Sequence, residues 1–430
     1  MKYLNYNYAE NSQIYWENND NNFYIPKIDI RNEYDLVIIG SGLTALSAAY
    51  HLDKNKSILI IDKCSIGYGG SSRNGGFCCL GGTKLSFQEI ENKYGNKELV
   101  KFFHIQKEAI ALVKEILEER ITTDEVGEII YYYKESALLK ECKDLEKFKS
   151  KLNLEYEVLS KNDLKTKRLN IHNNQGAIKM NYGFGINPKN LVYKLIKKII
   201  KNQNVDFCEN TEVLSIKKNH HSNFEIKIQE KVIKSKKCIL ATNGYLNRKN
   251  LNKTIYNNII PALSNIIVTE PIENSEFNDW KTLVPCADHI PLLHYFRLLK
   301  DNRIMFGGRG GHSYRDTHTY KKIILNDFNN LFPEFKNKKI EFFWRGLVGV
   351  TKDKIAHLGV NDEMYYGYGY NGNGVSLATY FGKVLANLID KKIYLKDLPD
   401  CITRKPEEMP FSELKRFYLF LAYQYYKFKF

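Results

Sequence analysis

The chain has 430 residues, enough for two or three domains or one large composite fold. Its 43% hydrophobic and 26% charged residues are typical of a soluble globular protein and exclude a disordered or fibrous chain. The net charge of +15 would permit an anionic partner, but the cations are 52 lysines against 12 arginines, whereas nucleic-acid-binding surfaces favour arginine. We therefore expect lysines spread over the whole surface and no nucleic-acid partner.

The cysteines and the N-terminus indicate the cellular setting. The eight cysteines include no CxxC pair and no Cys/His spacing suited to zinc, so we expect free thiols and no metal. The first residues lack an apolar signal segment, and no run reaches the roughly 18 apolar residues of a spanning helix. These features predict a cytoplasmic protein.

An irregular segment precedes the first regular elements. Residues 1–30 are polar and aromatic and are expected to form an N-terminal arm. Residues 35–39 (DLVII) form a short apolar run, typical of a strand buried on both faces of a parallel sheet. A Gly-rich turn, a helix to about residue 52 and a second apolar run at residues 58–61 follow. This order predicts a βαβ unit.

The rest of the chain alternates between helix and strand patterns. Apolar periodicity predicts helices at residues 99–120, 191–201 and 374–388, and strands at residues 128–133, 205–216, 224–228, 238–241 and 364–369. Strand patterns dominate residues 255–343. The predicted fold class is therefore α/β plus α+β, with a doubly wound domain built from separate segments beside a mostly antiparallel domain.

The turn after the first strand has the form of a dinucleotide-binding turn. It reads GSGLTA at residues 40–45, in which Gly40 permits a tight bend, Gly42 lets the backbone approach a pyrophosphate, and Ala45 keeps helix and strand close. Asp62 ends the next strand 22 residues after Gly40, where a ribose hydroxyl would be held. We interpret the segment as a dinucleotide site, with a coincidental glycine turn as the alternative.

The loop that follows Asp62 favours FAD over NAD. It reads GYGGSSRNGG at residues 67–76 and offers many backbone N–H groups, two hydroxyls and a guanidinium. A nicotinamide site has no need of such a loop there, whereas a flavin that extends along the sheet edge does. A merely flexible loop is the alternative.

These segments resemble a known family. The stretch GSGLTALSAAYHL…LIIDKCSIGYGGSSRNGGF is similar to the FAD-dependent oxidoreductases of the D-amino-acid oxidase superfamily, and within it to the γ-glutamylputrescine oxidoreductase-like branch. The similarity covers most of the chain, including CILATNGY at residues 238–245 and GYNGNGVSLATYFGKVLANLI at residues 369–389. With the predicted elements it implies a Rossmann-like FAD-binding domain (31–125, 160–250 and 344–395), an antiparallel-sheet substrate domain (126–159 and 251–343) and a C-terminal helical tail (396–430).

The resemblance also implies roles for residues far from the glycine turn. Val213 is implied to meet the adenine, with Ala241 and Thr242 on the adenosine side. The N–H groups of residues 372–375 would face the flavin pyrimidine, where negative charge accumulates on reduction; a simple turn and helix cap is the alternative. The expected FAD-binding residues are Gly40, Gly42, Leu43, Thr44, Ala45, Asp62, Lys63, Ser71, Ser72, Arg73, Asn74, Gly75, Gly76, Val213, Ala241, Thr242, Gly346, Gly372, Asn373, Gly374 and Val375.

The chain departs from the family pattern at four positions. Asp62 stands where the superfamily usually has Glu, and Ser72 where the branch more often has Gly. Amino-acid-oxidising members clamp a substrate carboxylate with an Arg in the segment where this chain has Val348, which favours an amine substrate. Members with covalent flavin often attach it through a Cys in the same segment, where this chain has Gly346, so FAD is expected to be noncovalent.

Amine oxidation moves a hydride to flavin N5, so the protein must place the C–N bond, keep the amine neutral and exclude water. The candidate catalytic residues are His294, Tyr295, Arg297 and Arg309, because Tyr or His can hydrogen-bond an amine and Arg can hold a distal carboxylate. Each could equally be structural.

The sequence thus predicts an enzyme that oxidises a small-molecule amine, γ-glutamylputrescine-like, to an imine, with oxygen or another acceptor reoxidising the flavin. The alternatives are a glycine, sarcosine or D-amino-acid oxidase or dehydrogenase, and an FAD protein associated with nucleic acid or membrane that turns over no amine. The basic aromatic tail is expected to pack as a helix, with peripheral membrane contact as the alternative.

Overall fold

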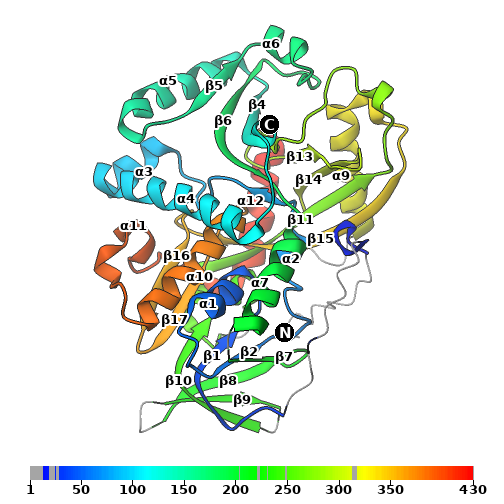
Figure 1. Ribbon diagram of the computed structural model, residues 1–430. Helices are drawn as coiled ribbons and strands as arrows, with labels where there is room; N and C mark the ends of the chain where they lie inside the picture. Colours follow the sequence, from blue (N-terminus) through cyan, green and yellow to red (C-terminus); the bar gives the residue numbers. More distant parts are fainter. Residues whose placement is uncertain are drawn as a thin grey trace.

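Two β-sheets form the frame of the molecule (Figure 1). The computed structural model describes residues 13–18, 25, 29–202, 204–219, 223–229, 231–246, 249–311 and 317–429. In spatial order the first sheet contains β16 (His357–Asn361), β17 (Met364–Tyr368), β10 (Lys231–Leu240), β1 (Glu33–Ile39), β2 (Ile58–Ile61) and β7 (Val205–Cys208). In addition, β9 (Phe224–Ile228) pairs with β10, and β8 (Val213–Lys218) pairs with β9.

The centre of the first sheet is parallel and buried on both faces. The strands β17, β10, β1, β2 and β7 run parallel, as βαβ connections require. Along β1, Leu36 and Ile38 pack in one apolar cluster, whereas Val37 and Ile39 pack in another on the opposite face. The predicted two-sided burial of this strand is therefore confirmed.

Three helices lie over one face of this sheet: α1 (Leu43–His51), α7 (Pro188–Asn202) and α10 (Val375–Ile389). A fourth helix, α4 (Asn96–Leu117), packs on α10 and α7. The helices α1 and α10 touch backbone to backbone. A Cβ at Gly382 of α10 would lie 2.5 Å from the Thr44 carbonyl oxygen of α1. This contact sets the spacing of the two helices that begin at the carboxyl edge of the sheet.

The second sheet is antiparallel apart from the parallel β12–β4 pair. Its spatial order is β15 (Ile340–Thr351), β11 (Ile259–Thr269), β14 (Ile304–Arg309), β13 (Tyr295–Leu298), β12 (Cys286–Asp288), β4 (Val126–Tyr132), β6 (Gly176–Gly185) and β3 (Phe77–Cys78), with β5 (Tyr156–Leu159) paired to β6. On one face a cluster of aromatic side chains packs against α9 (Thr317–Leu331).

The remaining elements connect these layers. They are η1 (Tyr15–Asn18), α2 (Gly70–Arg73), α3 (Phe87–Tyr94), η2 (Thr123–Glu125), α5 (Glu135–Leu152), α6 (Lys161–Thr166), η3 (Asn243–Tyr245), α8 (Lys253–Asn258), η4 (Asn274–Glu276), η5 (Pro333–Phe335), η6 (Leu395–Asp397), α11 (Asp400–Thr403), η7 (Ser412–Leu414) and α12 (Lys415–Lys429). The predicted α/β plus α+β class is confirmed.

Three local predictions are corrected. The single strand expected at residues 205–216 is two strands, β7 and β8, because Asn210 adopts a φ of +53° and breaks the extended backbone. The strand-dominated region also holds α9, which buries Ile324, Phe328 and Leu331 at helical spacing. Finally, β6 and β15 pair with the second sheet, although the predicted boundaries place most of their residues in the FAD-binding domain.

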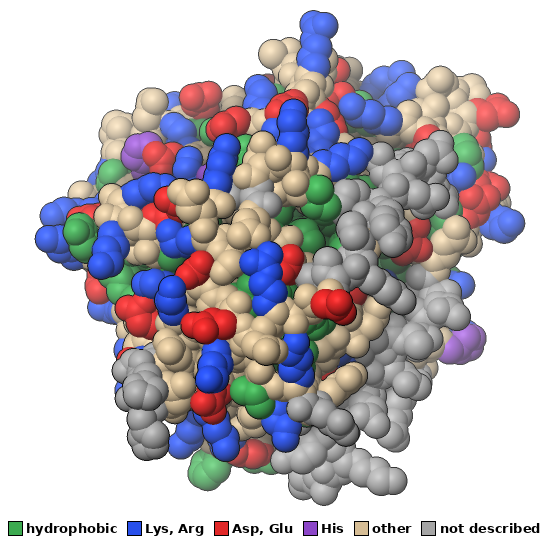
Figure 2. All heavy atoms as spheres, turned by 60° about the horizontal axis from the view of Figure 1, so that its bottom comes forward, with side chains coloured by type: hydrophobic (Ala, Val, Ile, Leu, Met, Phe, Trp, Pro, Cys, Tyr) green, Lys and Arg blue, Asp and Glu red, His purple; other side chains and the backbone are tan. Residues whose placement is uncertain are grey.

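The described surface mixes charges of both signs. On the face shown in Figure 2, lysines and arginines are interspersed with Asp and Glu. The C-terminal helix α12 leaves Phe417, Leu421 and Tyr425 exposed, while the Tyr423 hydroxyl accepts a hydrogen bond from the Gly311 N–H. Among the described helices, none combines the length and apolarity needed to cross a membrane.

Candidate functional site

A cavity of about 460 Å³ lies between the carboxyl ends of the parallel strands and one face of the second sheet. Ligands of open α/β sheets bind at this edge. The predicted FAD-binding residues that line the cavity are Gly40, Gly42, Leu43, Thr44, Asp62, Lys63, Ser71, Arg73, Asn74, Gly75, Val213, Ala241, Thr242, Gly346, Gly372, Asn373, Gly374 and Val375. The structure thus brings together residues that are far apart in the sequence.

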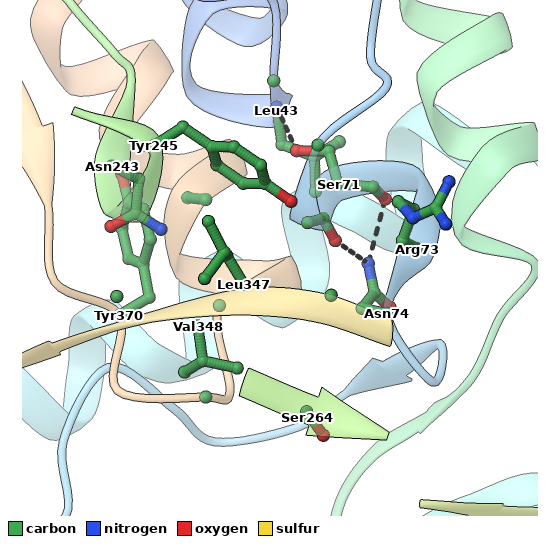
Figure 3. Close-up of a pocket in the computed structure, with 18 of the residues that line it drawn as sticks. Leu43, Ser71, Arg73, Asn74, Asn243, Tyr245, Ser264, Leu347, Val348 and Tyr370 are labelled. Carbon is green, nitrogen blue, oxygen red and sulfur yellow. Dashed lines mark hydrogen bonds between the residues drawn. The ribbon is translucent and has the colours of Figure 1, made fainter. Parts of the chain in front are cut away.

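The turn between β1 and α1 fits closely against neighbouring backbone. Gly40 has a φ of +96°, and a Cβ there would lie 2.8 Å from the Ala241 carbonyl oxygen. Gly42 is the N-cap of α1 and offers no side-chain cap, so the Leu43 N–H donates instead to the Ser71 Oγ at 2.9 Å (Figure 3). The open end of the helix therefore faces the cavity with its partial positive charge.

The Asp62 carboxylate is hydrogen-bonded to the turn between β1 and α1. Its Oδ2 accepts hydrogen bonds from the Ser41 N–H at 2.8 Å and the Ser41 hydroxyl at 2.6 Å, and its Oδ1 accepts one from the Cys64 N–H at 2.9 Å. Burial raises the pKa of Asp62, while these hydrogen bonds act in the opposite direction. Beside it, Lys63 forms an ion pair with Glu212 at 3.2 Å.

The glycine-rich loop contains one turn of helix, α2, and is not a flexible loop. The Asn74 amide donates to the carbonyl oxygens of Gly70 and Ser71, at 2.9 Å each, and its Oδ1 accepts from the Gly76 N–H at 2.7 Å (Figure 3). Trp16 of the N-terminal segment donates its indole N–H to the Asn74 carbonyl oxygen at 3.0 Å. These bonds hold Ser71 in place beside α1.

Three predicted cofactor residues lie outside the cavity lining: Ala45, Ser72 and Gly76. Ala45 is buried in the helix layer and Ser72 is buried beneath the loop. Gly76 has a φ of +73°, and a Cβ there would lie 2.1 Å from the Ile186 carbonyl oxygen. The structure thus places these three residues behind the cavity lining, where they pack against the elements that form it.

The helix α10 presents a second open N-terminus to the cavity. Its N-cap is Gly374, which provides no side-chain hydrogen bond. Two buried polar atoms that belong to cavity-lining residues, Thr242 Oγ1 and Asn373 Oδ1, have no hydrogen-bond partner in the described part of the chain. Buried polar atoms are ordinarily satisfied, so both point to a polar ligand.

The second sheet supplies the other wall of the cavity through six neighbouring strands. It contributes Val348 from β15, Ser264 from β11, Gly308 from β14, Tyr295 from β13, Ala287 from β12 and Glu128 from β4. The Tyr295 and Ser264 hydroxyls are hydrogen-bonded at 2.8 Å, and burial raises the pKa of Tyr295 to about 12. The Tyr295 ring fills the space over Gly307, where a Cβ would lie 2.2 Å from the ring.

His294 does not line the cavity and is held by two carboxylates. Its Nδ1 lies 2.7 Å from Asp288 Oδ2, its Nε2 lies 3.3 Å from Asp327 Oδ2, and its ring stacks on Phe306. Burial alone would lower the pKa of His294, but the two carboxylates raise it to about 9. The structure thus places the predicted catalytic residue His294 between two carboxylates and outside the lining of the cavity.

Arg297 is not among the residues that line the cavity. Arg297 donates to the Ile186 carbonyl oxygen at 2.6 Å and lies over the Trp16 ring, and burial lowers the pKa of its guanidinium to about 10. Arg309 ends β14 opposite Ser264, and its side chain lies outside the described residues. Among the three catalytic candidates whose side chains the structure describes, Tyr295 alone lines the cavity, and Arg297 is engaged with Ile186 and Trp16 instead of facing it.

Several lining residues were not predicted from the sequence. They include Lys84, Glu128, Asn243, Tyr245, Leu347 and Tyr370. Tyr245 and Leu347 lie together over the loop that carries Ser71 (Figure 3). The Tyr370 hydroxyl is hydrogen-bonded to the Thr44 Oγ1 at 2.6 Å. Tyr245 is the last residue of the quoted CILATNGY segment, but no local pattern marks Lys84 or Glu128.

These features fit a bound FAD. The turn beside Gly42 and the N-terminus of α1 would hold the diphosphate. Asp62 would accept a hydrogen bond from a ribose hydroxyl, and the N-terminus of α10 would face the flavin ring. The two orphaned polar atoms, Thr242 Oγ1 and Asn373 Oδ1, would gain partners from such a ligand.

Comparisons with known proteins agree with this geometry. A family model described as FAD dependent oxidoreductase (DAO) matches residues 35–388. The chain is 27% identical over 404 residues to "Probable oxidoreductase OrdL" of Haemophilus influenzae, with 90% of each chain covered. It is 26% identical over 385 residues to "Gamma-glutamylputrescine oxidoreductase" of Escherichia coli K12, covering 86% of this chain and 87% of that one. The crystal structure of glycine oxidase from Geobacillus kaustophilus has a similar fold, with a TM-score of 0.69 at 18% identity over 85% of this chain and 96% of that chain.

Replacing Gly42 with Val should abolish FAD binding. The new Cβ would lie 2.7 Å from the Ser71 Oγ, so the side chain would displace Ser71 from the Leu43 N–H and fill the space at the start of α1. The measurement is the ratio of flavin to protein after purification. Asp62→Ala, the graded comparison, should weaken binding by only about 1–3 kcal/mol, the cost of one charge-assisted hydrogen bond. Full flavin occupancy in Gly42→Val would contradict the placement of the diphosphate.

The ion pairs of His294 with Asp288 and Asp327 should make the free energy of unfolding decrease at alkaline pH. Because the folded-state pKa of about 9 exceeds the ordinary value near 6.5, the stabilisation is complete below about pH 6.5 and is lost as the pH rises through about 9. We expect wild type to exceed His294→Gln in stability by about 1–3 kcal/mol at low pH, with the difference shrinking between about pH 6.5 and 9.5. Thermal unfolding across this range measures it.

The matched control is the same substitution at His104, whose side chain is 72% exposed. His104→Gln should follow wild type at every pH. If the stability difference between His294→Gln and wild type stayed constant across this pH range, His294 would not be protonated between Asp288 and Asp327.

Proposed function

The chain belongs to the family of FAD-dependent oxidoreductases, and we propose that it oxidises a primary or secondary amine of the γ-glutamylputrescine kind to an imine, which water then hydrolyses to an aldehyde. The similarity to a γ-glutamylputrescine oxidoreductase over most of both chains supports the choice of substrate class. The observation that carries the proposal is the wall opposite the helix N-termini, where strand β15 presents Val348 and offers no cation along its cavity-lining stretch.

This wall suits an uncharged reacting amine. Val348, Ile266, Leu292 and Leu293 are apolar, and the hydroxyls of Tyr295 and Ser264 provide hydrogen bonds without charge. Because burial raises the pKa of Tyr295 to about 12, its hydroxyl stays protonated at neutral pH and can donate to the lone pair of a neutral amine.

When bound, FAD supplies the acceptor for the hydride that leaves the carbon next to nitrogen. The chain's own residues do the rest. The Tyr295 ring packs between Gly75 and Gly307, where a Cβ at either glycine would lie 2.9 Å or less from it, so the phenol is held in one position. A fixed ring and an apolar wall orient the C–N bond and exclude water.

A second candidate function is the oxidation of an α-amino acid. It is favoured by one observation: the Lys84 side chain lies beside Val348 at the start of α10, since both approach within 4 Å of the Cβ position of Gly372. An ammonium there could hold the carboxylate that the family's arginine holds in amino-acid-oxidising members.

We propose further that the FAD is noncovalent, because Gly346 stands where some relatives carry a linking cysteine. Acid denaturation of the purified yellow protein should release all of the FAD into the supernatant, as measured by its absorption spectrum. Flavin colour that stays with the precipitate would contradict noncovalent binding without affecting the rest of the proposal.

The substrate class is tested by anaerobic stopped-flow reduction of the flavin. We expect γ-glutamylputrescine to reduce it at least ~100-fold more efficiently than glycine, sarcosine or D-alanine, a difference of about 2.7 kcal/mol in transition-state binding. The physical reason is that β15 carries Val348 where amino-acid-oxidising members have an arginine, so this strand offers no charged partner to an α-carboxylate next to the reacting carbon. Comparable rates with an α-amino acid would favour the second candidate instead.

A further inference from the structure

Two charged side chains in the cavity have no role in the proposed chemistry. Lys84 lies in the segment between β3 and α3, and its Nζ comes within 3.9 Å of the Cβ position at Gly372. Glu128 lies on β4, in the wall formed by the second sheet. Both line the cavity.

Neither charge is matched by an ion pair in the described part of the chain. The carboxyl group of Glu128 has the Cys79 thiol as its hydrogen-bonding neighbour, and no hydrogen bond of the Lys84 ammonium occurs among the described residues. The Lys84 ammonium and the Glu128 carboxylate are more than 4.0 Å apart, but each charge shifts the pKa of the other group. Because Lys84 and Glu128 have opposite charges and line the same cavity without contacting each other, a ligand could bind between them.

The two charges differ in their exposure. Glu128 is partly buried, and burial raises the pKa of its carboxyl group to about 7, although the Lys84 charge and the Cys79 thiol act in the opposite direction. Lys84 is exposed to solvent and lines the same cavity. A ligand that brings a positive group to Glu128 would offset the burial penalty there, and a negative group of the same ligand could pair with the accessible Lys84 ammonium.

We propose that Lys84 and Glu128 together bind an α-amino-acid group in its zwitterionic form, with the carboxylate on Lys84 and the ammonium on Glu128. The proposal rests on the proposed function, because it assigns this group to the substrate of the same site. It makes the pair a specificity determinant, absent from the set of catalytic candidates identified in the sequence.

The zwitterion could come from the γ-glutamyl end of an amine or from a free amino acid. An ammonium held by a carboxylate keeps its proton, because the neighbouring negative charge raises its pKa. A protonated amine cannot release a hydride from its carbon. A γ-glutamyl amine avoids this conflict, since its zwitterion binds to the pair while its other amine remains free to react.

The test is isothermal titration calorimetry of the FAD-loaded protein with γ-glutamylethylamide, which carries the zwitterion but no second amine to oxidise. Binding to wild type should weaken about 10- to 100-fold in Lys84→Met and in Glu128→Gln, as expected for the loss of a charged hydrogen bond. Lys84→Arg should retain binding. n-Butylamine, which has no carboxylate, should bind Lys84→Met no more weakly than wild type.

Matched controls remove the same charges elsewhere. Lys300 is 76% exposed and lies 3.8 Å from Glu125, while Glu157 is paired with Lys167 on the surface. Lys300→Met and Glu157→Gln should bind γ-glutamylethylamide as wild type does. Flavin content and melting temperature of each variant establish that it is folded and loaded.

A sarcosine arm separates the two sources of the zwitterion. If sarcosine and not γ-glutamylethylamide binds with a dependence on both charges, the pair recognises a free amino acid, and the proposed function gives way to the second candidate. If wild type binds neither ligand, or if both variants bind as tightly as wild type, the pair has no such role. Because this probe is not turned over, that result is independent of whether γ-glutamylputrescine reduces the flavin.

Discussion

The contact between α1 and α10 determines the geometry of the candidate site. At Gly382 the helices come so close that a Cβ would lie 2.6 Å from the Ser47 Cβ, and the Thr44–Tyr370 hydrogen bond adds a second attachment near their starts. Both helices consequently begin at the same edge of the parallel sheet, and their positive ends act on one volume. A diphosphate and a ring that gains negative charge on reduction are stabilised by the same effect.

The two walls of the cavity differ in whether their charged side chains already have partners within the protein. On the side of the first sheet, Asp62 and Lys63 are already engaged, by Ser41 and Glu212 respectively, so that wall is rigid before a ligand arrives. On the side of the second sheet, the cavity is lined by the neutral hydroxyls of Tyr295 and Ser264 and by Glu128, and Lys84 lies beside Val348. The groups on the first wall are thus held by bonds within the protein, whereas Lys84 and Glu128 form no ion pair in the described part of the chain.

Sequence reasoning succeeded where the signal was local. The strand at residues 35–39, the turn at Gly40 and the acidic residue at the end of the next strand form one contiguous unit, and the structure has all three in the expected places. It failed where partners come from distant segments. His294 forms an ion pair with Asp327 of α9, and the aromatic residues of that helix also fit a strand pattern in the sequence. Arg297 donates a hydrogen bond to the Ile186 carbonyl oxygen and lies over the Trp16 ring. Lys84 is one of 52 lysines and becomes distinctive only when the Gly372 turn lies beside it.

The strand order of the first sheet has a consequence for biosynthesis. Central strand β1 is made early, yet one of its two neighbours, β10, begins only at Lys231, and β17 and α10 follow after Met364. A nascent chain thus carries β1 with one unpaired apolar edge until residues 231–240 have been synthesised, a state prone to aggregation. The cavity is complete only after α10 has been synthesised, so a bound cofactor can stabilise the chain only from that point onward.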